Sequence, residues 1–441
     1  MITLLIPFLA IYVFIIWQLY KRDRSILIND IFWLFSSWIM MFGIYLFSGI
    51  NYYYKVSLND LLYVIAFFVF YLLGRYIGLK SKNQHGYKPY SIKVSDNTLL
   101  VLTIFGALLR IIDVIRLNGF LNIDRNNVQS SFIGIIGSFF SPIGLPLFFL
   151  IAFRAKKNQK RIPAKAFVAL IMYVLPVILL SGRLNLVFAL IALVIVLLGV
   201  EAQTNETEYR VERKVPRRQK VLIAILLGLG IFTFLAYSNF IISNRFSSFE
   251  RLLLASGLNE SFSIEETSLF FYSKFGAFGS LVFQILNYYS AQFKNIALIV
   301  DNFRGPYSWG LMQMPYIARR TDFFENIVDR TNDALLVATS RGSRGFTGFG
   351  STWITVVGDM VIDFGLMGAL LVVFIIGILI GRKRAVYIKN PESPYEFTIQ
   401  AMLCVCMFFT IQLSPFFETS LVYGFIWVWL LSHFKIGHIK S

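Results

Sequence analysis

Long apolar blocks separated by short charged loops dominate the chain. Each block has about twenty residues, the length that an α-helix needs to cross the hydrocarbon core of a bilayer. Apolar residues are continuous within the blocks and do not alternate with polar ones, so the pattern favours helices over the strands of a membrane barrel. We therefore predict an all-α fold that crosses a membrane many times.

Hydropathy and flanking charge predict about eleven spans. They cover residues 2–20, 31–49, 61–79, 98–118, 132–153, 166–181, 184–200, 221–238, a long segment that ends near residue 380, 397–413 and 417–434. The chain thus divides into residues 1–238 with eight spans, a large loop at residues 239–350, and residues 351–441 with three spans. The first block has no basic segment before it, so we interpret it as a span and not as a cleaved signal peptide.

Lysine and arginine are concentrated in alternate loops. These loops are residues 21–24, 80–93, 154–157, 210–220 and 382–384, together with the C-terminal end of the chain. The positive-inside rule places them in the cytoplasm, which predicts a bacterial inner-membrane protein with a periplasmic N-terminus and a cytoplasmic C-terminus. The large loop then lies outside, and its content of Leu, Phe and Tyr over residues 268–290 favours ordered helices at the membrane face.

Composition supports a membrane protein. Hydrophobic residues make up 57% of the chain and charged residues 15%, with a mean hydropathy of +0.66; soluble domains are about 25% charged. The net charge of +17 would suit nucleic acid, but its distribution follows the positive-inside pattern, so we expect no nucleic-acid partner. Cys404 and Cys406 share one apolar span and provide neither a disulfide framework nor a zinc site.

Arginines on the predicted outer side are candidates for binding phosphate, because a guanidinium group holds phosphate oxygens in a bidentate fork. No cluster with metal-ligand spacing is visible in the sequence, so we predict no metal site and no cofactor. A solvated surface of mixed charge explains the loop arginines equally well. The candidates are Arg183, in a tight hairpin, and Arg245, Arg319, Arg320, Arg330, Arg341 and Arg344, in the large loop.

Carboxylates near the outer boundary are the candidate bases, because the three histidines fall on the cytoplasmic side. Asp359 and Asp363 are four residues apart on a predicted helix and so share a face. Glu418 lies in a short outer hairpin. Carboxylates inside a membrane are functional candidates, although helix capping or pairing with arginine explains them as well. The glycine-rich segment 341–352 before these aspartates would let the backbone approach a ligand closely.

Two further groups have alternative interpretations. Arg110, Asp113 and Arg116 are spaced to lie near one face of a predicted helix, where they form either a self-paired cluster or the wall of a polar cavity. Tyr288 and Tyr289 could stack on sugars, or belong to an interfacial aromatic belt.

The sequence resembles the O-antigen polymerase family, the Wzy-type polymerases of oligosaccharide repeat units. The resemblance rests on the number of spans, one large outer loop before the last three of them, and three short segments at 181–183, 287–291 and 348–368. It implies a multi-span, GT-C-like glycosyltransferase that acts without metal on the periplasmic face and builds lipopolysaccharide O-antigen or capsule. The implied donor and acceptor are oligosaccharides linked to undecaprenyl pyrophosphate, and the implied partners are a chain-length-regulating co-polymerase and a flippase.

The same resemblance implies roles for the candidate residues. Arg183, Arg341 and Arg344 would neutralise pyrophosphate, and Asp359, Asp363 or Glu418 would accept the hydroxyl proton. Substrate-binding candidates are Arg116, Arg245, Arg319, Arg320, Arg330, Tyr288 and Tyr289. The chain lacks the spaced arginine-to-glycine pattern of some family members and the outer histidine typical of the related ligases. A flippase or transporter of the lipid-linked oligosaccharide, or an O-antigen ligase, remains the alternative.

Overall fold

Helices form most of the part of the chain that the structure describes. The structure is a computed structural model, and it describes residues 26–81, 94–118, 131–179, 184–200, 235–240, 248–256, 262–318, 321–340, 354–412, 414–416 and 418–433, with a few single positions between them. Five described segments are long and apolar enough to cross a membrane: Asp30–Phe47, Leu58–Lys80, Asp96–Leu117, Phe132–Lys157 and Val356–Lys389. Shorter apolar helices cover Ala164–Leu179, Leu184–Gly199, Pro394–Phe409 and Thr419–Ser432. The all-α membrane class predicted from the sequence agrees with these helices.

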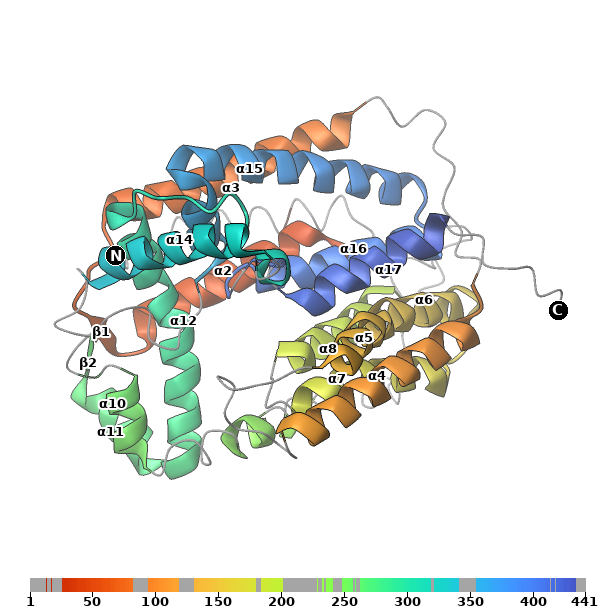
Figure 1. Cartoon of the computed structure of the whole chain (residues 1–441), viewed down its shortest axis with the longest axis horizontal. Coiled ribbons are helices and arrows are strands. Elements are labelled where there is room, and N and C mark those ends of the chain that lie inside the picture. Colours follow the sequence, from red (N-terminus) through yellow and green to blue (C-terminus); the bar gives the residue numbers. More distant parts are fainter. Residues whose placement is uncertain are drawn as a thin grey trace.

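The first half of the chain supplies helices to both sides of the bundle: the helix of residues 58–80 lies at the top, and the helices between residues 96 and 194 lie at the lower right (Figure 1). Its helices are α2 (Asp30–Phe47), α3 (Leu58–Lys80), α4 (Asp96–Asn118), α5 (Phe132–Phe140), α6 (Gly144–Lys157), α7 (Ala164–Leu179) and α8 (Leu184–Val194). A short 3-10 turn, Ser141–Ile143, separates α5 from α6, and Ile195–Gly199 continues α8 as a π-helical turn. Predicted spans 31–49 to 184–200 correspond to these helices, whereas 2–20 and most of 221–238 lie outside the described residues.

The segment predicted as a large loop is mainly helical. It contains α10 (Phe249–Ala255), α11 (Glu266–Lys274), α12 (Gly276–Asn302), α13 (Pro315–Ala318) and α14 (Asp322–Ser340). Strand β2 (Phe262–Ile264) pairs antiparallel with β1 (Ile50–Tyr52), and this pairing fastens the segment to the turn after α2. In Figure 1, α12 runs crosswise over one end of the bundle; we call this end the α12 end.

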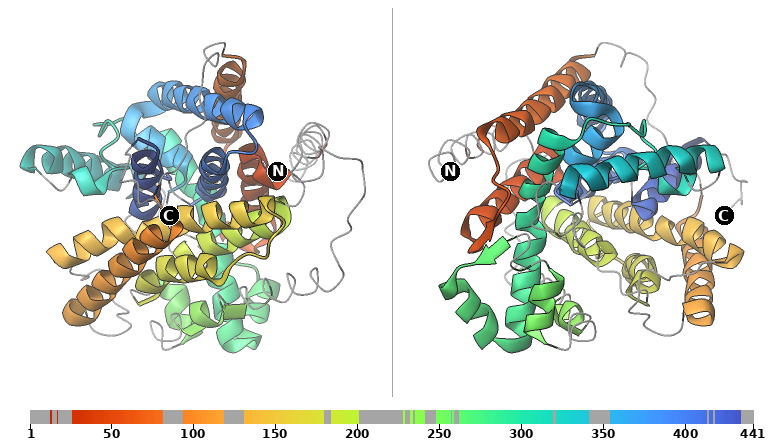
Figure 2. Two further views of the ribbon diagram at one scale, coloured as in Figure 1. Left: turned by 90° about the vertical axis from the view of Figure 1, so that its right-hand side faces the viewer. Right: turned by 60° about the vertical axis from the view of Figure 1, so that its left-hand side comes forward.

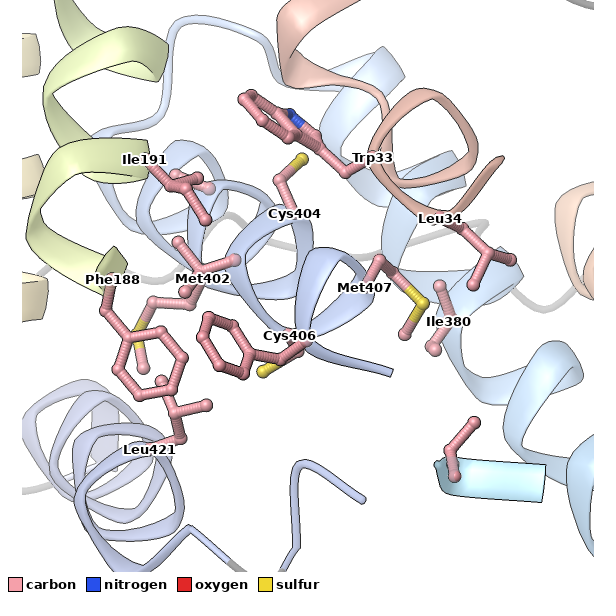
Figure 3. Packing of buried hydrophobic residues seen from close by; sticks show 14 of the residues in the cluster. Trp33, Leu34, Phe188, Ile191, Ile380, Met402, Cys404, Cys406, Met407 and Leu421 are labelled. Carbon is pink, nitrogen blue, oxygen red and sulfur yellow. The ribbon is translucent and has the colours of Figure 1, made fainter. Parts of the chain in front are cut away.

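The last three helices complete the bundle. They are α15 (Val356–Lys389), α16 (Pro394–Phe409) and α17 (Thr419–His433). Helix α16 lies at the centre of the main apolar core, where its Met402, Cys406 and Met407 face residues of α2, α8, α15 and α17 (Figure 3). Two further views show α15 lying along α3 at one edge of the bundle (Figure 2).

Helices α3 and α15 pack in parallel through small residues. Each helix carries two glycines four residues apart, at 74 and 78 in α3 and at 377 and 381 in α15. A Cβ atom on Gly377 would lie 2.4 Å from the carbonyl oxygen of Tyr71. This spacing of small residues lets two membrane helices approach until their backbones touch, which explains why these two helices are paired so closely.

Replacing Gly377 by Ile is expected to separate α3 from α15 and to lower the unfolding temperature in detergent. The added side chain overlaps backbone atoms, and overpacking of a tight interface costs about 1–3 kcal/mol or more. Gly43→Ile is the matched control, because a Cβ atom on Gly43 meets nothing within 4 Å. Equal melting temperatures for the two variants would show that the close packing of α3 and α15 does not stabilise the fold.

Helix α15 continues beyond the predicted end near residue 380 and ends at Lys389. The basic residues 382–384, predicted as a loop, are therefore helical. Arg384 is buried, and its Nη1 donates a hydrogen bond of 2.6 Å to the carbonyl oxygen of Ile28. Beside it, Arg75 forms a bidentate ion pair with Asp30, at 2.7 and 2.8 Å. These contacts fasten α2, α3 and α15 together at the end opposite α12.

Candidate active site

The start of α15 brings together three segments at the α12 end of the bundle. Thr355 caps the helix, because its side chain accepts a hydrogen bond from the Gly358 amide. The Val356 amide donates to the carbonyl oxygen of Thr410 at 2.9 Å, which fastens α15 to the end of α16. Residues 303–314, which follow α12, and residues 410–418, which link α16 to α17, both meet the first two turns of α15. These turns carry Asp359 and Asp363.

Asp363 is fully buried, and its side chain holds the 303–314 segment in place. One carboxylate oxygen accepts hydrogen bonds from the hydroxyl of Ser308 and, at 3.2 Å, from the amide of Met312. The other accepts a hydrogen bond of 2.7 Å from Nε2 of Gln313. Because these donors use both oxygens, we assign Asp363 a positioning role. These partners are loop residues, so the contacts of Asp363 are neither those of a helix cap nor those of a pair with arginine, the two alternatives considered from the sequence.

A kink follows Asp363 directly. Gly365 has φ +73°, a left-handed conformation that favours glycine. A Cβ atom at this position would also lie 2.8 Å from the ring of Tyr307, so the close approach of the 303–314 segment excludes a larger residue. The kink separates the turn that bears the aspartates from the long apolar part of α15.

Asp359 is only half-buried and carries fewer hydrogen bonds. Its Oδ2 accepts a hydrogen bond of 2.7 Å from the amide of Ser414. The hydroxyl of Ser414 in turn donates to Oε1 of Gln313 at 2.5 Å. A chain of contacts therefore links the two aspartates through Gln313 and Ser414, and we call these four residues the Asp359–Asp363 cluster. Within it, Asp359 is the carboxylate that a substrate hydroxyl could reach.

Glu418 directly precedes helix α17 and lies near an arginine of α4. The Ser420 hydroxyl donates to Glu418 Oε1 at 2.9 Å, and the Tyr173 hydroxyl lies 3.1 Å from that of Ser420. Arg110 is close enough to Glu418 for their charges to interact. Helix capping thus accounts for one oxygen of Glu418, which also accepts a hydrogen bond from the amide of Ser420.

Aromatic side chains of α12 reach the same 410–418 segment. Nε2 of Gln412 donates a hydrogen bond of 3.0 Å to the hydroxyl of Tyr288. The ring of Tyr289 lies edge-on to that of Tyr288, with centroids 5.8 Å apart. The candidates Asp359, Glu418 and Tyr288, which are distant in sequence, therefore all contact or belong to one short segment.

The other predicted site residues are placed differently. Arg116 on α4 and Arg330 on α14 are exposed. Asp113 accepts hydrogen bonds from the amide and hydroxyl of Ser131, whereas Arg116 is exposed. The side chains at positions 110, 113 and 116 of α4 therefore have different surroundings. The remaining candidates lie outside the described residues: Arg183, Arg245, Arg319, Arg320, Arg341 and Arg344.

Lys294 is a buried charge that the sequence analysis missed. It lies on α12, is 6% exposed, and its ammonium lies 5.7 Å from the ring centre of Tyr52. Burial lowers the pKa of Lys294 to about 8. The only signal in the sequence is a single lysine in the otherwise uncharged stretch between residues 275 and 300.

Replacing Lys294 by Met is expected to stabilise the protein by about 2–3 kcal/mol at pH 7, because a lowered lysine pKa means that burial disfavours the charged form. Below pH 8 the folded and unfolded states both carry the proton, so the full cost of burial is present. Between pH 8 and about 10.5 Lys294 is protonated only in the unfolded state, so the wild-type protein becomes more stable as the pH rises. The difference in stability between Lys294→Met and the wild type then shrinks. Thermal unfolding of both proteins from pH 7 to pH 10 measures this difference. The exposed Lys274→Met is the control, and a gain that did not depend on pH would contradict the burial argument.

Comparison with known proteins identifies no relative. No protein-family model, characterised protein or solved structure matches this chain. Among the described residues, no group of three or more His, Cys, Asp or Glu side chains lies close enough to hold a metal ion.

Proposed function

We propose that this chain polymerises oligosaccharide repeat units carried on undecaprenyl pyrophosphate, by glycosyl transfer on the periplasmic face of a bacterial inner membrane. One observation carries the proposal. Asp359 of α15 and Tyr288 of α12 each contact the segment 410–418, to which Glu418 belongs, at the end of an apolar helix bundle. The family resemblance of the sequence supplies the substrate class and the reaction.

In this proposal the α12 end faces the periplasm. Residues 382–384 and the start of α16 are at the opposite end, and the positive-inside rule assigns such basic segments to the cytoplasm. The helices between residues 249 and 340 then cover the outer surface beside the candidate site. About eleven spans, with the N-terminus outside and the C-terminus inside, complete this topology.

The chemical step joins two lipid-linked sugars. The terminal hydroxyl of the acceptor repeat unit attacks the anomeric carbon of the donor saccharide. A new C–O bond forms, the bond between that carbon and the pyrophosphate oxygen breaks, and undecaprenyl pyrophosphate leaves with the bonding electrons. Asp359 accepts the hydroxyl proton, while Asp363, Gln313 and Ser414 fix the turn that carries it.

Arginines neutralise the charge that develops on the leaving pyrophosphate. Arg183, Arg341 and Arg344 are assigned this role, since a guanidinium group stabilises phosphate oxygens without a metal ion. Tyr288, which contacts Gln412, and its neighbour Tyr289 are the aromatic side chains on which sugars would stack. Holding two membrane-tethered substrates side by side supplies much of the remaining rate enhancement.

The surface polysaccharide of a strain that lacks this chain tests the proposal. We expect long chains to disappear while a single repeat unit is still attached to its anchor, because the units are exported but not joined. Loss of every exported unit would indicate a flippase instead. Full-length chains accumulating on undecaprenyl lipid would indicate a ligase. Either result would overturn the polymerase assignment.

A further inference from the structure

The segment that follows α12 contains a tight turn at residues 308–311. The Leu311 amide donates a hydrogen bond of 3.1 Å to the carbonyl oxygen of Ser308. The two residues between them, Trp309 and Gly310, have φ +56° and +94°. Positive φ at both central positions is the pattern of a type I′ turn, which favours Asn-Gly and disfavours a bulky residue at its first central position.

The backbone of Trp309 is strained, and contacts with Asp363 hold it in this conformation. A left-handed backbone is costly for a bulky residue and persists only where the surrounding structure imposes it. The carbonyl oxygen of Asp363 accepts a hydrogen bond of 2.9 Å from the Trp309 amide. Its carboxylate accepts hydrogen bonds from Ser308 and Met312, on either side of Trp309. The turn is therefore built onto the Asp359–Asp363 cluster.

The side chain of Trp309 is 73% exposed, although tryptophan is highly buried on average. Burial of the ring therefore does not offset the cost of its backbone. Trp429 on α17 is also exposed, by 55%, but it has a helical backbone in a segment that lipid surrounds. A tryptophan that only anchors the protein at the lipid interface thus needs no left-handed backbone. An exposed ring on a strained turn beside the candidate site indicates a ligand that stacks on the ring.

We propose that the ring of Trp309 is a binding platform for a sugar ring and so contributes to the affinity for saccharide. The C–H face of a pyranose ring is apolar and can stack on an aromatic face, while its hydroxyl groups remain free to bond polar groups. Gln313, four residues farther along the same segment, and Asp359 provide such groups in the cluster. The inference rests on the proposed function for the identity of the saccharide, and it adds a binding residue outside the carboxylates that react.

Saccharide binding and thermal unfolding of variants in nanodiscs test the platform. The probe is the free repeat-unit oligosaccharide of the strain's own surface polysaccharide, without lipid or pyrophosphate, and its Kd is measured by saturation-transfer NMR. Trp309→Asn should raise the Kd about tenfold, the change expected when roughly 60 Å² of apolar sugar surface returns to water. The same variant should raise the unfolding temperature, because Asn is favoured in this turn. Trp309→Tyr keeps an aromatic ring and should restore most of the affinity without the gain in unfolding temperature.

Trp429→Leu is the matched control, and it should leave the Kd unchanged because this ring faces lipid. Several results would overturn the inference: no binding of the probe to the wild-type protein, an unchanged Kd in Trp309→Asn, or equal losses of affinity in Trp309→Asn and Trp309→Tyr. A lower unfolding temperature in Trp309→Asn would also overturn it, because the ring would then serve the fold or the membrane interface.

The assay measures binding of a saccharide without its lipid carrier, so its result is separate from that of the proposed function. Binding through Trp309 without polymerisation would remove the polymerase and leave the platform. Polymerisation with an unchanged Kd in Trp309→Asn would remove the platform and leave the polymerase.

Discussion

Replacing Asp359 by Asn is expected to lower the rate of polymerisation by about 10²- to 10⁴-fold, the contribution typical of a general base. An Asn side chain still accepts the hydrogen bond from the Ser414 amide, so the local structure and the amount of protein in the membrane should not change. The rate is measured as product chain length against time with purified lipid-linked repeat unit.

Asp363→Asn provides the contrast to this variant. Asp363 is fully buried, and its carboxylate accepts three hydrogen bonds, two from side chains and one from the backbone amide of Met312. An amide nitrogen in place of one oxygen would face a donor, and an unsatisfied buried polar group costs about 1–3 kcal/mol. We therefore expect a lower unfolding temperature and a lower yield for Asp363→Asn.

A normal rate of polymerisation for Asp359→Asn would exclude Asp359 as the base and leave Glu418 as the next candidate.

Arg183→Ala is expected to abolish long polysaccharide chains while the protein accumulates normally. The physical reason is the loss of a fixed positive charge where the leaving pyrophosphate gains negative charge. Polysaccharide banding in cells that express the variant is the measurement. Arg251→Ala is the control, because Arg251 is an exposed arginine of α10 with no assigned role. Wild-type chain length in Arg183→Ala would refute the role of Arg183.

The helical fold could be predicted from the sequence because apolar blocks of span length report directly on helices in lipid. The ends of spans were less predictable. Residues 382–384 look like a loop, since three adjacent basic residues normally lie in water. In the structure they continue α15, because Arg384 finds the carbonyl oxygen of Ile28, which is more than 350 residues away in the sequence. A contact between such distant residues leaves no local pattern.

The candidate site could be predicted only in part for the same reason. The spacing of Asp359 and Asp363 indicates a shared helical face, and both carboxylates do belong to one cluster. Their different roles depend on Gln313 and Ser414, which are ordinary polar loop residues in the sequence. The nearness of Arg110 to Glu418 likewise follows from the packing of α4 and α17 against the same 3-10 turn, Ser141–Ile143, and not from the spacing of residues in α4.

A reconstituted reaction tests the central claim most directly. The purified chain is placed in liposomes with a single oligosaccharide repeat unit on undecaprenyl pyrophosphate and with EDTA, and both saccharide length and released undecaprenyl pyrophosphate are measured. We predict a ladder of lengthened products, with one lipid pyrophosphate released for each new glycosidic bond. Unchanged repeat units, or a ladder that forms only when a divalent metal is added, would contradict the account.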